Sequence, residues 1–494
     1  MKHTGFRVSL MTLAIVAIGL ASAPATAVTT ANVSISIKSG GVRTDKIPED
    51  FLGISLESSS IAAANNGGRE WLSGTSGPFS TMMKRIGVKN VRIGGNSAER
   101  TGYPTVTDAR SVDDFANLIG ANLMWVLPVK NNTYDNASWV STANAMFDDQ
   151  KAKGYTFSTT YLIGNEPDID MAANGSNPDN PAIPYSTWRY RYNNYNTQLR
   201  AHDNSITSSG PSGAGCCSYA TSFENDATYS GSLQYSVGYV TQHTYPLGAS
   251  NSYPPNSQEA ITAYLQDNSA KYQSFYNGWA ANAASRGFKT RLDETNSQYH
   301  NTTDQPLSYE YASTLWVLDY LSYLAYHTQT GGMNIHSGPI GSNGYNVVSP
   351  IGVASSYTLR PIGYGMFAFS YEGSGQPLSA DITSNDSGVN ISAYALKEGK
   401  GSASAHILNK THGTGAVDAT VKLKFAGYAH CDVMYLKQAN SDVTATDGIT
   451  LGDAPVNTDG TWNGHYTVTG LVPVKNVFTI TVPHTQAAIV HFYN

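Results

Sequence analysis

Between about residue 50 and residue 340, short apolar or β-branched runs alternate with longer amphipathic stretches. This alternation is typical of βα units wound around a parallel sheet. There are eight such runs, and eight parallel strands are the number that closes a (β/α)8 TIM barrel. We therefore expect this α/β fold over residues 46–370. The eight predicted strands are Leu52–Leu56, Asn90–Ile93, Leu123–Pro128, Thr160–Gly164, Ser205–Gly210, Val237–Thr241, Thr290–Leu292 and Gly332–Ile335.

The stretches between these runs have a helical period. Leucines recur every three residues from Leu315 to Leu324, which places them on one face of a helix. We expect helices of this kind to cover the outside of the barrel. The clearest candidates are Ser111–Leu118, Tyr185–His202, Ser257–Ala284 and Ser308–His327.

After about residue 370 the pattern changes to short alternating strands separated by Gly, Asn and Asp. This pattern predicts a C-terminal antiparallel β-sandwich over residues 371–494. Val33–Ile37 alternates in the same way, so we expect residues 28–45 to add an N-terminal strand to the sandwich. The other predicted strands are Val389–Ala395, Ser402–Leu408, Ala419–Phe425, Cys431–Leu436, Phe478–Val482 and Ala487–Phe492.

The first 27 residues resemble a secretory signal peptide. Basic residues over 2–7 precede an apolar run over 8–21, and small residues at 25–27 suit a cleavage site. The apolar run is shorter than the roughly 20 residues of a membrane span. An uncleaved anchor is the alternative. We expect cleavage near Val28 and a secreted protein, periplasmic in a Gram-negative host, with no membrane span.

Charge and cysteine usage narrow the partners. A formal net charge of −6 offers no electrostatic basis for binding nucleic acid. Cys216 and Cys217 are adjacent and Cys431 is far away, a spacing that does not suit zinc. We expect no metal and no cofactor. The cysteines allow three arrangements: a disulfide from Cys431 to one of the adjacent pair, a disulfide within that pair, or three free thiols. The sequence does not indicate an oligomeric state.

Two glutamates follow predicted strands. Glu166 follows the fourth strand in the segment YLIGNEP, and Glu294 ends the seventh in RLDETNS. Residues at these strand ends point into the mouth of a barrel. Retaining glycoside hydrolysis uses two carboxyl groups about 5–5.5 Å apart, one as nucleophile and one as acid/base. The pair therefore predicts a retaining glycosidase with Glu166 as acid/base and Glu294 as nucleophile.

Asn-Glu on the fourth strand and Glu on the seventh resemble the large clan of retaining barrel glycosidases. Four segments are also similar to glycoside hydrolase family 79, the β-glucuronidase and heparanase family: Leu56-Glu57, Arg92–Asn96, Gln242–Tyr245 and Asp293–Ser297. The resemblance extends over nearly the whole predicted mature chain, because that family also has a C-terminal β-sandwich that takes in N-terminal residues.

The resemblance implies a set of substrate-binding residues, namely Glu57, Asn96, Asn165, Tyr245, Tyr299, Gly344 and Tyr345. Asn165 matches the asparagine that hydrogen-bonds the sugar 2-hydroxyl. Tyr245 matches a tyrosine that hydrogen-bonds the nucleophile. Tyr299, Gly344 and Tyr345 match the hydroxyls and main-chain amide that hold the substrate carboxylate.

Glu57 and Asn96 correspond to positions near the sugar's distal hydroxyls, and Asp108 is a further candidate there. We expect Arg92 to be a buried partner that orients the carboxylates. His243 is expected either as a core histidine hydrogen-bonded under the site or as a ligand contact.

These observations favour an exo-acting β-glucuronidase that removes terminal glucuronic acid, with or without a 4-O-methyl group, from glycans. The alternatives are an endo-β-glucuronidase, a neutral-sugar glycosidase of the same clan and a non-catalytic glycan-binding relative. Tyr299-His300-Asn301 and the loop after the eighth strand contain no cluster of Lys or Arg. This absence argues against a heparan-sulfate substrate.

Overall fold

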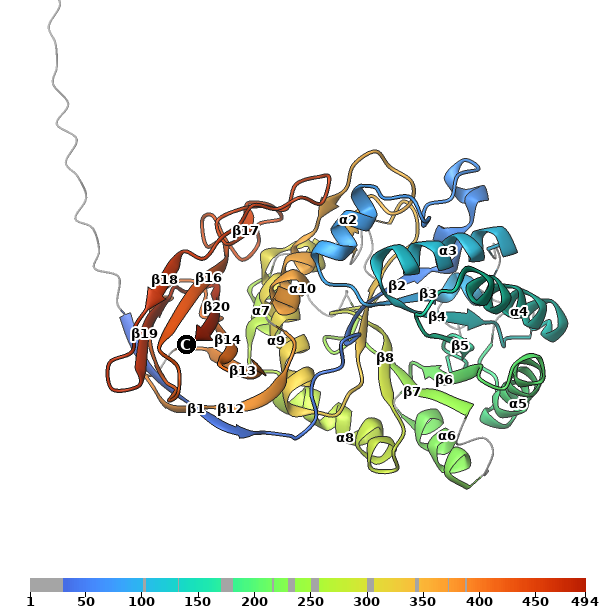
Figure 1. The fold of residues 1–494 in the computed structure, drawn as a ribbon, viewed down its shortest axis with the longest axis horizontal. Coiled ribbons are helices and arrows are strands. Elements are labelled where there is room, and N and C mark those ends of the chain that lie inside the picture. Colours follow the sequence, from blue (N-terminus) through green and yellow to red (C-terminus); the bar gives the residue numbers. More distant parts are fainter. Residues whose placement is uncertain are drawn as a thin grey trace, which may run out of the picture.

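The eight predicted barrel strands are present, and they close into a parallel barrel in which β2 pairs with β9. Figure 1 labels β2 to β8 of this barrel. The strands are β2 (Leu52–Glu57), β3 (Asn90–Gly94), β4 (Asn122–Leu127), β5 (Thr159–Ile163), β6 (Thr207–Gly213), β7 (Val237–Thr244), β8 (Thr290–Thr295) and β9 (Met333–Ser337). The computed structural model describes residues 30–100, 104–131, 133–169, 181–215, 217–229, 236–249, 257–299, 306–342, 346–371, 373–386 and 389–494. The predicted signal peptide therefore lies outside the described residues.

Strand β8 carries an irregularity that the alternating pattern did not predict. Thr241 and His243 of β7 pair with Arg291 and Glu294, so β8 has one more residue than its neighbour over this interval. The same extra residue appears against β9, where Leu292 and Thr295 oppose Met333 and Ile335. Such a bulge re-aims the side chains beside it. Asp293 and Glu294, which are adjacent in sequence, both contact groups inside the barrel.

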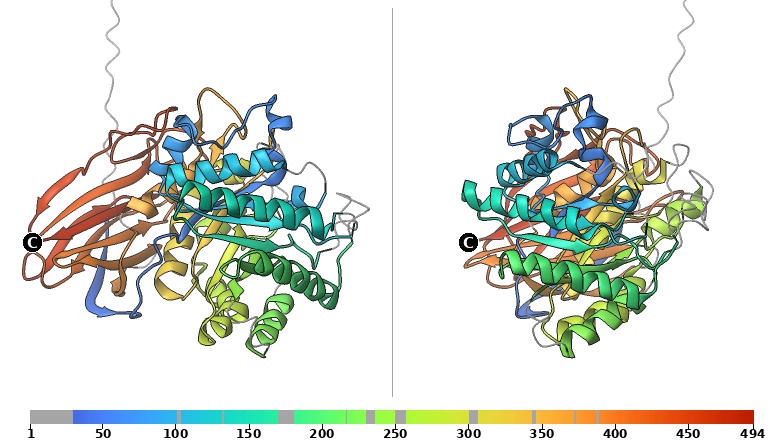
Figure 2. Two further views of the ribbon diagram at one scale, coloured as in Figure 1. Left: turned by 45° about the vertical axis from the view of Figure 1, so that its right-hand side comes forward. Right: turned by 90° about the vertical axis from the view of Figure 1, so that its right-hand side faces the viewer.

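Helices cover the outside of the barrel, as Figure 2 also shows. They are α1 (Ser58–Ile61), α2 (Pro78–Arg85), α3 (Val106–Ile119), α4 (Asn136–Lys153), α5 (Tyr185–His202), α6 (Ser218–Tyr229), α7 (Gln258–Leu265), α8 (Ser269–Ser285), α9 (Tyr311–His327) and α10 (Pro361–Tyr371). Short 3-10 turns are η1 (Ala63–Asn66), η2 (Asn96–Glu99) and η5 (Pro306–Tyr309), and β10 (Val348–Ser349) pairs with β11 (Thr358–Leu359).

The single helix predicted over Ser257–Ala284 is wrong, because the chain breaks between α7 and α8. The Asn268 side chain donates to the carbonyls of Ala263 and Gln266, and the Asp267 carboxylate accepts the Ser269 N–H. Asn and Asp compete with helical hydrogen bonds in this way. The break directs the two helices separately.

The C-terminal part forms a sheet in the order β17-β16-β20-β14-β13-β12-β1-β15-β19, with β18 beside β16. The predicted N-terminal strand is confirmed: β1 pairs antiparallel with β12 and, unlike the other pairs, parallel with β15. Strand β19, at one end of this order, packs over β20, the third strand from the other end, since the ring centroids of Phe478 and Phe492 lie 5.3 Å apart. The strands are β1 (Thr30–Gly41), β12 (Gln376–Asn385), β13 (Ile391–Gly399), β14 (Ser402–Asn409), β15 (Asp418–Lys424), β16 (His430–Gln438), β17 (Ile449–Leu451), β18 (Val468–Leu471), β19 (Val477–Val482) and β20 (Gln486–Tyr493).

Helix α9 joins the barrel to the sheet domain. Nearly all of its residues are buried, as expected for a helix enclosed between two layers. Its Asp319 accepts hydrogen bonds from Lys410 at 2.8 Å and from the Tyr394 hydroxyl at 2.8 Å. The two domains therefore share a buried ion pair and one packed interface.

Two further expectations concern cysteines and membranes. Cys431 is a free, buried thiol in β16, whereas Cys217 is disulfide-bonded, so a bridge between Cys431 and the adjacent pair is excluded. Cys216 lies outside the described residues. Within the described part of the chain, no helix has the length and apolarity that a membrane crossing requires.

Candidate active site

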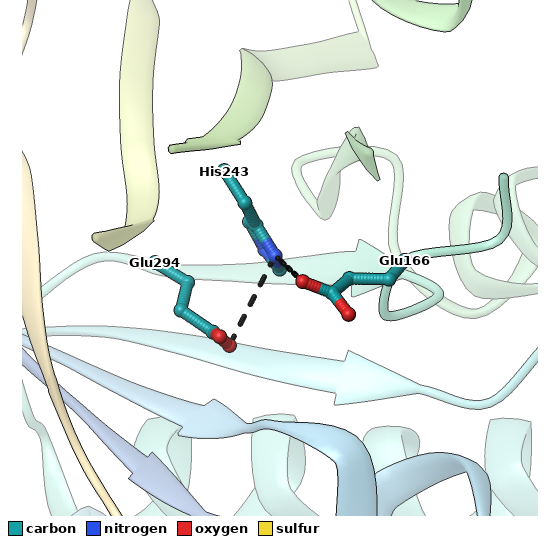
Figure 3. Close-up of side chains that lie close together, drawn as sticks. All are labelled: Glu166, His243 and Glu294. Atoms are coloured by element: carbon teal, nitrogen blue, oxygen red, sulfur yellow. Dashed lines mark hydrogen bonds and ion pairs between the residues drawn. The ribbon is translucent and has the colours of Figure 1, made fainter. Parts of the chain in front are cut away.

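The two predicted catalytic glutamates come together at the carboxyl end of the barrel (Figure 3). Glu166 follows β5, and Glu294 lies near the end of β8. A carboxylate oxygen of each, together with a ring nitrogen of His243, lies within 4.8 Å of the other two. Both glutamates are largely buried, at 9% and 6% exposure. The two acids therefore face each other across a shared histidine.

Glu294 is surrounded by donors. Arg92 Nη1 donates to its Oε2 at 2.6 Å, and the Tyr245 hydroxyl donates to Oε1 at 2.7 Å. Burial opposes ionisation of Glu294, but the charges of His336, His243 and Arg92 and the bond from Tyr245 outweigh it, so the pKa of Glu294 lies well below its usual range. Glu294 is thus held as a carboxylate.

Glu166 sits in an unusual backbone conformation. Its φ is +47°, in the left-handed region that costs a non-glycine residue about 1–2 kcal/mol. The backbone N–H of Glu166 donates to the carbonyl of Ser212 on β6 at 2.9 Å. The preceding Gly164 has φ +97°, and a Cβ there would lie 2.5 Å from a methyl of Val129. Contacts with the neighbouring strands therefore hold a strained loop in place.

His243 connects the acid/base candidate to a buried aspartate. Its Nδ1 lies 3.0 Å from Glu166 Oε1, and its Nε2 lies 3.4 Å from Asp293 Oδ2. Burial lowers the pKa of His243, but the charges of Asp293 and Glu294 and the hydrogen bonds raise it to about 10. His243 therefore lies beneath the two glutamates, one of the two positions considered from the sequence, and its Nε2 also lies 3.3 Å from Arg92 Nη2.

Arg92 is fully buried and orients several site residues, as predicted. Besides Glu294, it donates through Nη2 to Asn165 Oδ1 at 2.6 Å, and its Nε lies 3.4 Å from Asp293. Asn165 Nδ2 donates in turn to Asn96 Oδ1 at 3.3 Å. One guanidinium thus connects the nucleophile candidate to the asparagine beside the acid/base candidate.

Glu57 lies at the end of β2 and is 6% exposed. It accepts from the Ser97 N–H at 2.8 Å and the Asn96 N–H at 3.3 Å. Burial opposes its ionisation, but His336 and the bonds from Ser97 keep the pKa of Glu57 below its ordinary value. Gly95 permits this approach, because a Cβ there would lie 2.4 Å from the Glu57 carboxyl carbon.

The remaining predicted contacts have different positions. Tyr299 is 42% exposed and packs edge-on against Tyr245, with ring centroids 6.0 Å apart. Gly344 and Tyr345 lie outside the described residues. Asp108 is buried, and its carboxylate accepts from the Thr105 N–H and the Ala63 N–H, so it organises the start of α3.

Comparison with solved structures places the whole chain in a known architecture. A 4-O-α-L-rhamnosyl-β-D-glucuronidase from Fusarium oxysporum 12S aligns with TM-score 0.68 and 16% identity over 94% of this chain and 100% of its own. A family 30 subfamily 8 xylanase from Clostridium acetobutylicum aligns with TM-score 0.56 and 13% identity, covering 93% and 100%. A β-xylosidase from Caulobacter crescentus CB15 aligns with TM-score 0.56 and 13% identity over 93% of this chain and 99% of its own.

No protein-family model and no curated protein matches the sequence significantly. At 16% identity or less, the structural likeness shows a shared fold: a barrel with an attached β-sheet domain. The chemistry must be argued from the site itself.

Two site residues, His336 and Ser212, were not predicted from the sequence. His336 of β9 lies between two carboxylates of the site: its Nε2 is 3.6 Å from Glu57 Oε1 and its Nδ1 is 3.8 Å from Glu294 Oε2. Ser212 donates through Oγ to Asp293 at 2.7 Å. Extending the eighth predicted strand by one residue would have found His336, because Asn334 and His336 alternate inward. Nothing in the sequence marks the contact between Ser212 and Asp293.

Glu166, His243 and Glu294 are also the group of described residues whose ligand atoms lie close enough to hold a metal ion. Two contacts compete with a cation there. Arg92 donates to Glu294 Oε2 at 2.6 Å and Tyr245 donates to Oε1 at 2.7 Å, so both oxygens of Glu294 already have donors.

Proposed function

We propose that this protein is a retaining exo-β-glucuronidase related to glycoside hydrolase family 79, which removes terminal β-linked glucuronic acid, with or without a 4-O-methyl group, from glycans. The supporting observation is the spacing of the two acids, whose nearest oxygens lie within 4.8 Å. Retaining enzymes hold the two carboxyl groups about 5–5.5 Å apart, whereas inverting enzymes leave about 6.5–9.5 Å for a water molecule.

The surroundings of the two acids favour distinct roles. Arg92 and Tyr245 hold Glu294 as an anion, which suits the nucleophile that attacks the anomeric carbon. Glu166 then donates its proton to the leaving oxygen as the glycosidic bond breaks. In the second step Glu166 accepts a proton from water, the water oxygen attacks the anomeric carbon, and Glu294 leaves as a carboxylate. No cofactor takes part in this scheme.

Two observations support the preference for a uronate. The resemblance to family 79 assigns Tyr299, Gly344 and Tyr345 to the substrate carboxylate, and Tyr299 packs against the nucleophile's partner Tyr245 at 42% exposure. The fold neighbour with the TM-score of 0.68 is itself a rhamnosyl-glucuronidase. Both observations favour a glucuronide over a neutral sugar.

An activity-based epoxide of glucuronic acid configuration tests the proposal directly. We expect it to label Glu294, which mass spectrometry of the digested protein would locate. Proton NMR during hydrolysis of an aryl β-glucuronide should show the β-anomer of glucuronic acid as the first product. Labelling of another residue would overturn the nucleophile assignment, and an α-anomeric first product would overturn the retaining mechanism.

A neutral-sugar β-glycosidase is the second candidate, because a xylanase and a β-xylosidase share the fold. Matched 4-nitrophenyl β-glucuronide, β-xyloside and β-glucoside distinguish the two. Tyr299→Phe and Tyr345→Phe should reduce glucuronide cleavage and spare the neutral substrates. Equal losses on all three would argue against uronate recognition.

We also propose that the protein is exported. The test is N-terminal sequencing of the protein from the culture medium or periplasm of the producing cells, with a mature start expected near Val28. A start at Met1 would contradict cleavage.

A further inference from the structure

Glu99 is a buried carboxylate that the scheme above does not use. It lies in η2, after β3, and is fully buried. It belongs to none of the motifs that indicated the active site. Burial raises the pKa of Glu99, although the four groups that donate to it oppose the rise. A buried carboxylate destabilises a protein unless its oxygens are hydrogen-bonded. The donors that surround Glu99 therefore indicate what this residue does.

Those partners come from two other segments of the barrel mouth. Val129 N–H lies 3.0 Å from both Glu99 oxygens, and Lys130 N–H donates to Oε2 at 2.9 Å. The Thr133 hydroxyl donates to Oε2 at 3.0 Å. From the end of β5, the Asn165 N–H donates to Oε1 at 3.1 Å. One carboxylate therefore binds the loop after β4 and the residue before Glu166 together.

These N–H groups lie where the sheet can no longer pair them. The last bond between the two strands runs from the Gly164 N–H to the Leu127 carbonyl. Beyond it the two strands separate, and buried N–H groups without an acceptor would destabilise the fold. Glu99 supplies the missing acceptors on both sides. Lys130 strengthens the connection, because its Nζ donates to the Ile169 carbonyl at 2.7 Å.

The segment held in this way includes the strained acid/base loop. Glu166 has φ +47°, and a strained conformation persists only when its surroundings determine it strongly. Glu99 fixes Asn165 on one side of Glu166, and Lys130 fixes Ile169 on the other. We infer that Glu99 is a positioning residue for the acid/base, whose buried carboxylate keeps the Glu166 side chain directed at the leaving-group oxygen. This inference rests on the proposed role of Glu166.

Glu99→Gln tests it, because one oxygen becomes an amide that faces backbone N–H donors. Asp113→Asn is the matched control: Asp113 is a fully buried carboxylate of α3 that accepts from Gln150 at 2.6 Å and does not contact the loop. Hydrogen–deuterium exchange should increase in peptides covering residues 127–133 and 161–169 for Glu99→Gln. It should be unchanged in those peptides for Asp113→Asn.

The kinetic test uses aryl β-glycosides of the sugar that the wild type cleaves. A 2,4-dinitrophenyl group departs without acid assistance, whereas a phenyl group needs it. Glu99→Gln should lower kcat/KM about 10²-fold on the phenyl substrate and less than about 5-fold on the dinitrophenyl substrate. Glu166→Ala should give the same imbalance, and Asp113→Asn should give none.

The outcomes separate the two claims. If Glu166→Ala shows no imbalance between leaving groups, the proposed acid/base is wrong. If Glu166→Ala shows it and Glu99→Gln loses both substrates equally, or neither, Glu99 does not position the acid/base. Thr133→Val removes one donor and keeps the charge, so it serves if Glu99→Gln does not fold. Thr133→Val should lower kcat/KM more on the phenyl substrate than on the dinitrophenyl substrate, by a smaller ratio than Glu99→Gln. Equal effects of Thr133→Val on the two substrates would overturn the inference.

Discussion

The two ends of the barrel each bury an arginine, and the partners of the two arginines differ in kind. At the carboxyl end, Arg92 contacts Glu294, Asp293 and Asn165. At the amino end, Arg291 donates to the Asn334 amide oxygen at 2.6 Å and to the Asp50 carbonyl at 2.8 Å. Both arginines are fully buried.

The amino end is nearly balanced in charge. Asp50 is the carboxylate that faces Arg291, at 3.4 Å, and it also accepts from Asn122 at 3.1 Å. A cavity of about 540 Å³ opens beside it, lined mainly by neutral polar residues such as Thr160 and Tyr239. No proton need move for this arrangement to be stable. It completes the fold where the strands begin.

The carboxyl end is crowded with titratable groups. Glu166, Asp293 and Glu294 lie around the ring of His243, so a proton gained by one changes the others. At the amino end the buried arginine stabilises the fold, whereas at the carboxyl end it holds reactive groups in place. The two ends differ because only the partners of Arg92 can exchange protons with one another.

The largest expected difference between the two ends is in turnover. Glu294→Gln should lower kcat at least about 10⁴-fold, because no glycosyl-enzyme can form. Unfolding is measured on the same variant, because the change also removes a buried anion beside Arg92. Asp50→Asn, the matched change at the amino end, should keep kcat per folded molecule. Steady-state kinetics and urea unfolding measure both, and comparable turnover of Glu294→Gln and wild type would refute the nucleophile.

Replacing each buried arginine in turn tests whether the two ends of the barrel differ in function. Arg92→Met should destabilise the fold by about 3–5 kcal/mol, since it leaves the buried Asp293 and Glu294 without their cation. Arg291→Met should also destabilise the fold, because the Asn334 amide oxygen and the Asp50 carbonyl lose their donor. Arg92→Met should additionally lower kcat about 10²–10³-fold by releasing Glu294 and Asn165. If Arg291→Met lowered kcat equally in folded protein, the two ends would not be functionally distinct.

A smaller effect is expected from two tyrosines. Tyr245→Phe removes the donor to Glu294, which should raise the pKa of Glu294 and cost about 10- to 100-fold in kcat/KM. The acidic limb of the pH profile should move to higher pH. Tyr239→Phe is the control, because the Tyr239 hydroxyl lies 3.5 Å from Asp50 at the amino end. An unmoved acidic limb in Tyr245→Phe would contradict the role of Tyr245.

The smallest effect concerns the pH dependence of stability. The pKa of His243 is raised to about 10 in the folded protein, so its contribution is complete below the ordinary value near 6.5 and is lost as pH rises through 10. His243→Gln should reduce the fall in unfolding free energy over this range by about 1–3 kcal/mol relative to wild type. Asp50→Asn should leave the fall unchanged. An identical fall in His243→Gln and wild type would show that His243 is not protonated.

Regular elements were the most predictable part of the molecule. Tyr185–His202 was predicted with the bounds of α5, and all eight barrel strands appear within a few residues of their predicted positions. These elements bury an apolar face, and burial imposes the period that the sequence displays. The break between α7 and α8 was missed because it depends on the side-chain bonds of Asn268.

The site divides in the same way. Glu166 and Glu294 were found because each follows a strand, and a strand end in a parallel barrel always opens toward the mouth. Glu99 and His336 were missed because neither stands in a recognisable motif. Their roles arise from contacts with residues 30 to 66 positions away for Glu99, and 42 and 279 positions away for His336.

The barrel, the sandwich with its N-terminal strand and the two glutamates at the mouth could all be predicted from the order of residues along the chain. These properties follow from local alternation and from positions counted along the chain. The bulge in β8 that turns both Asp293 and Glu294 inward, and the carboxylate that holds the acid/base loop, became apparent in the folded chain alone. The physical reason is that charge, strain and hydrogen bonding at the mouth depend on groups that the closed barrel brings together from distant parts of the chain.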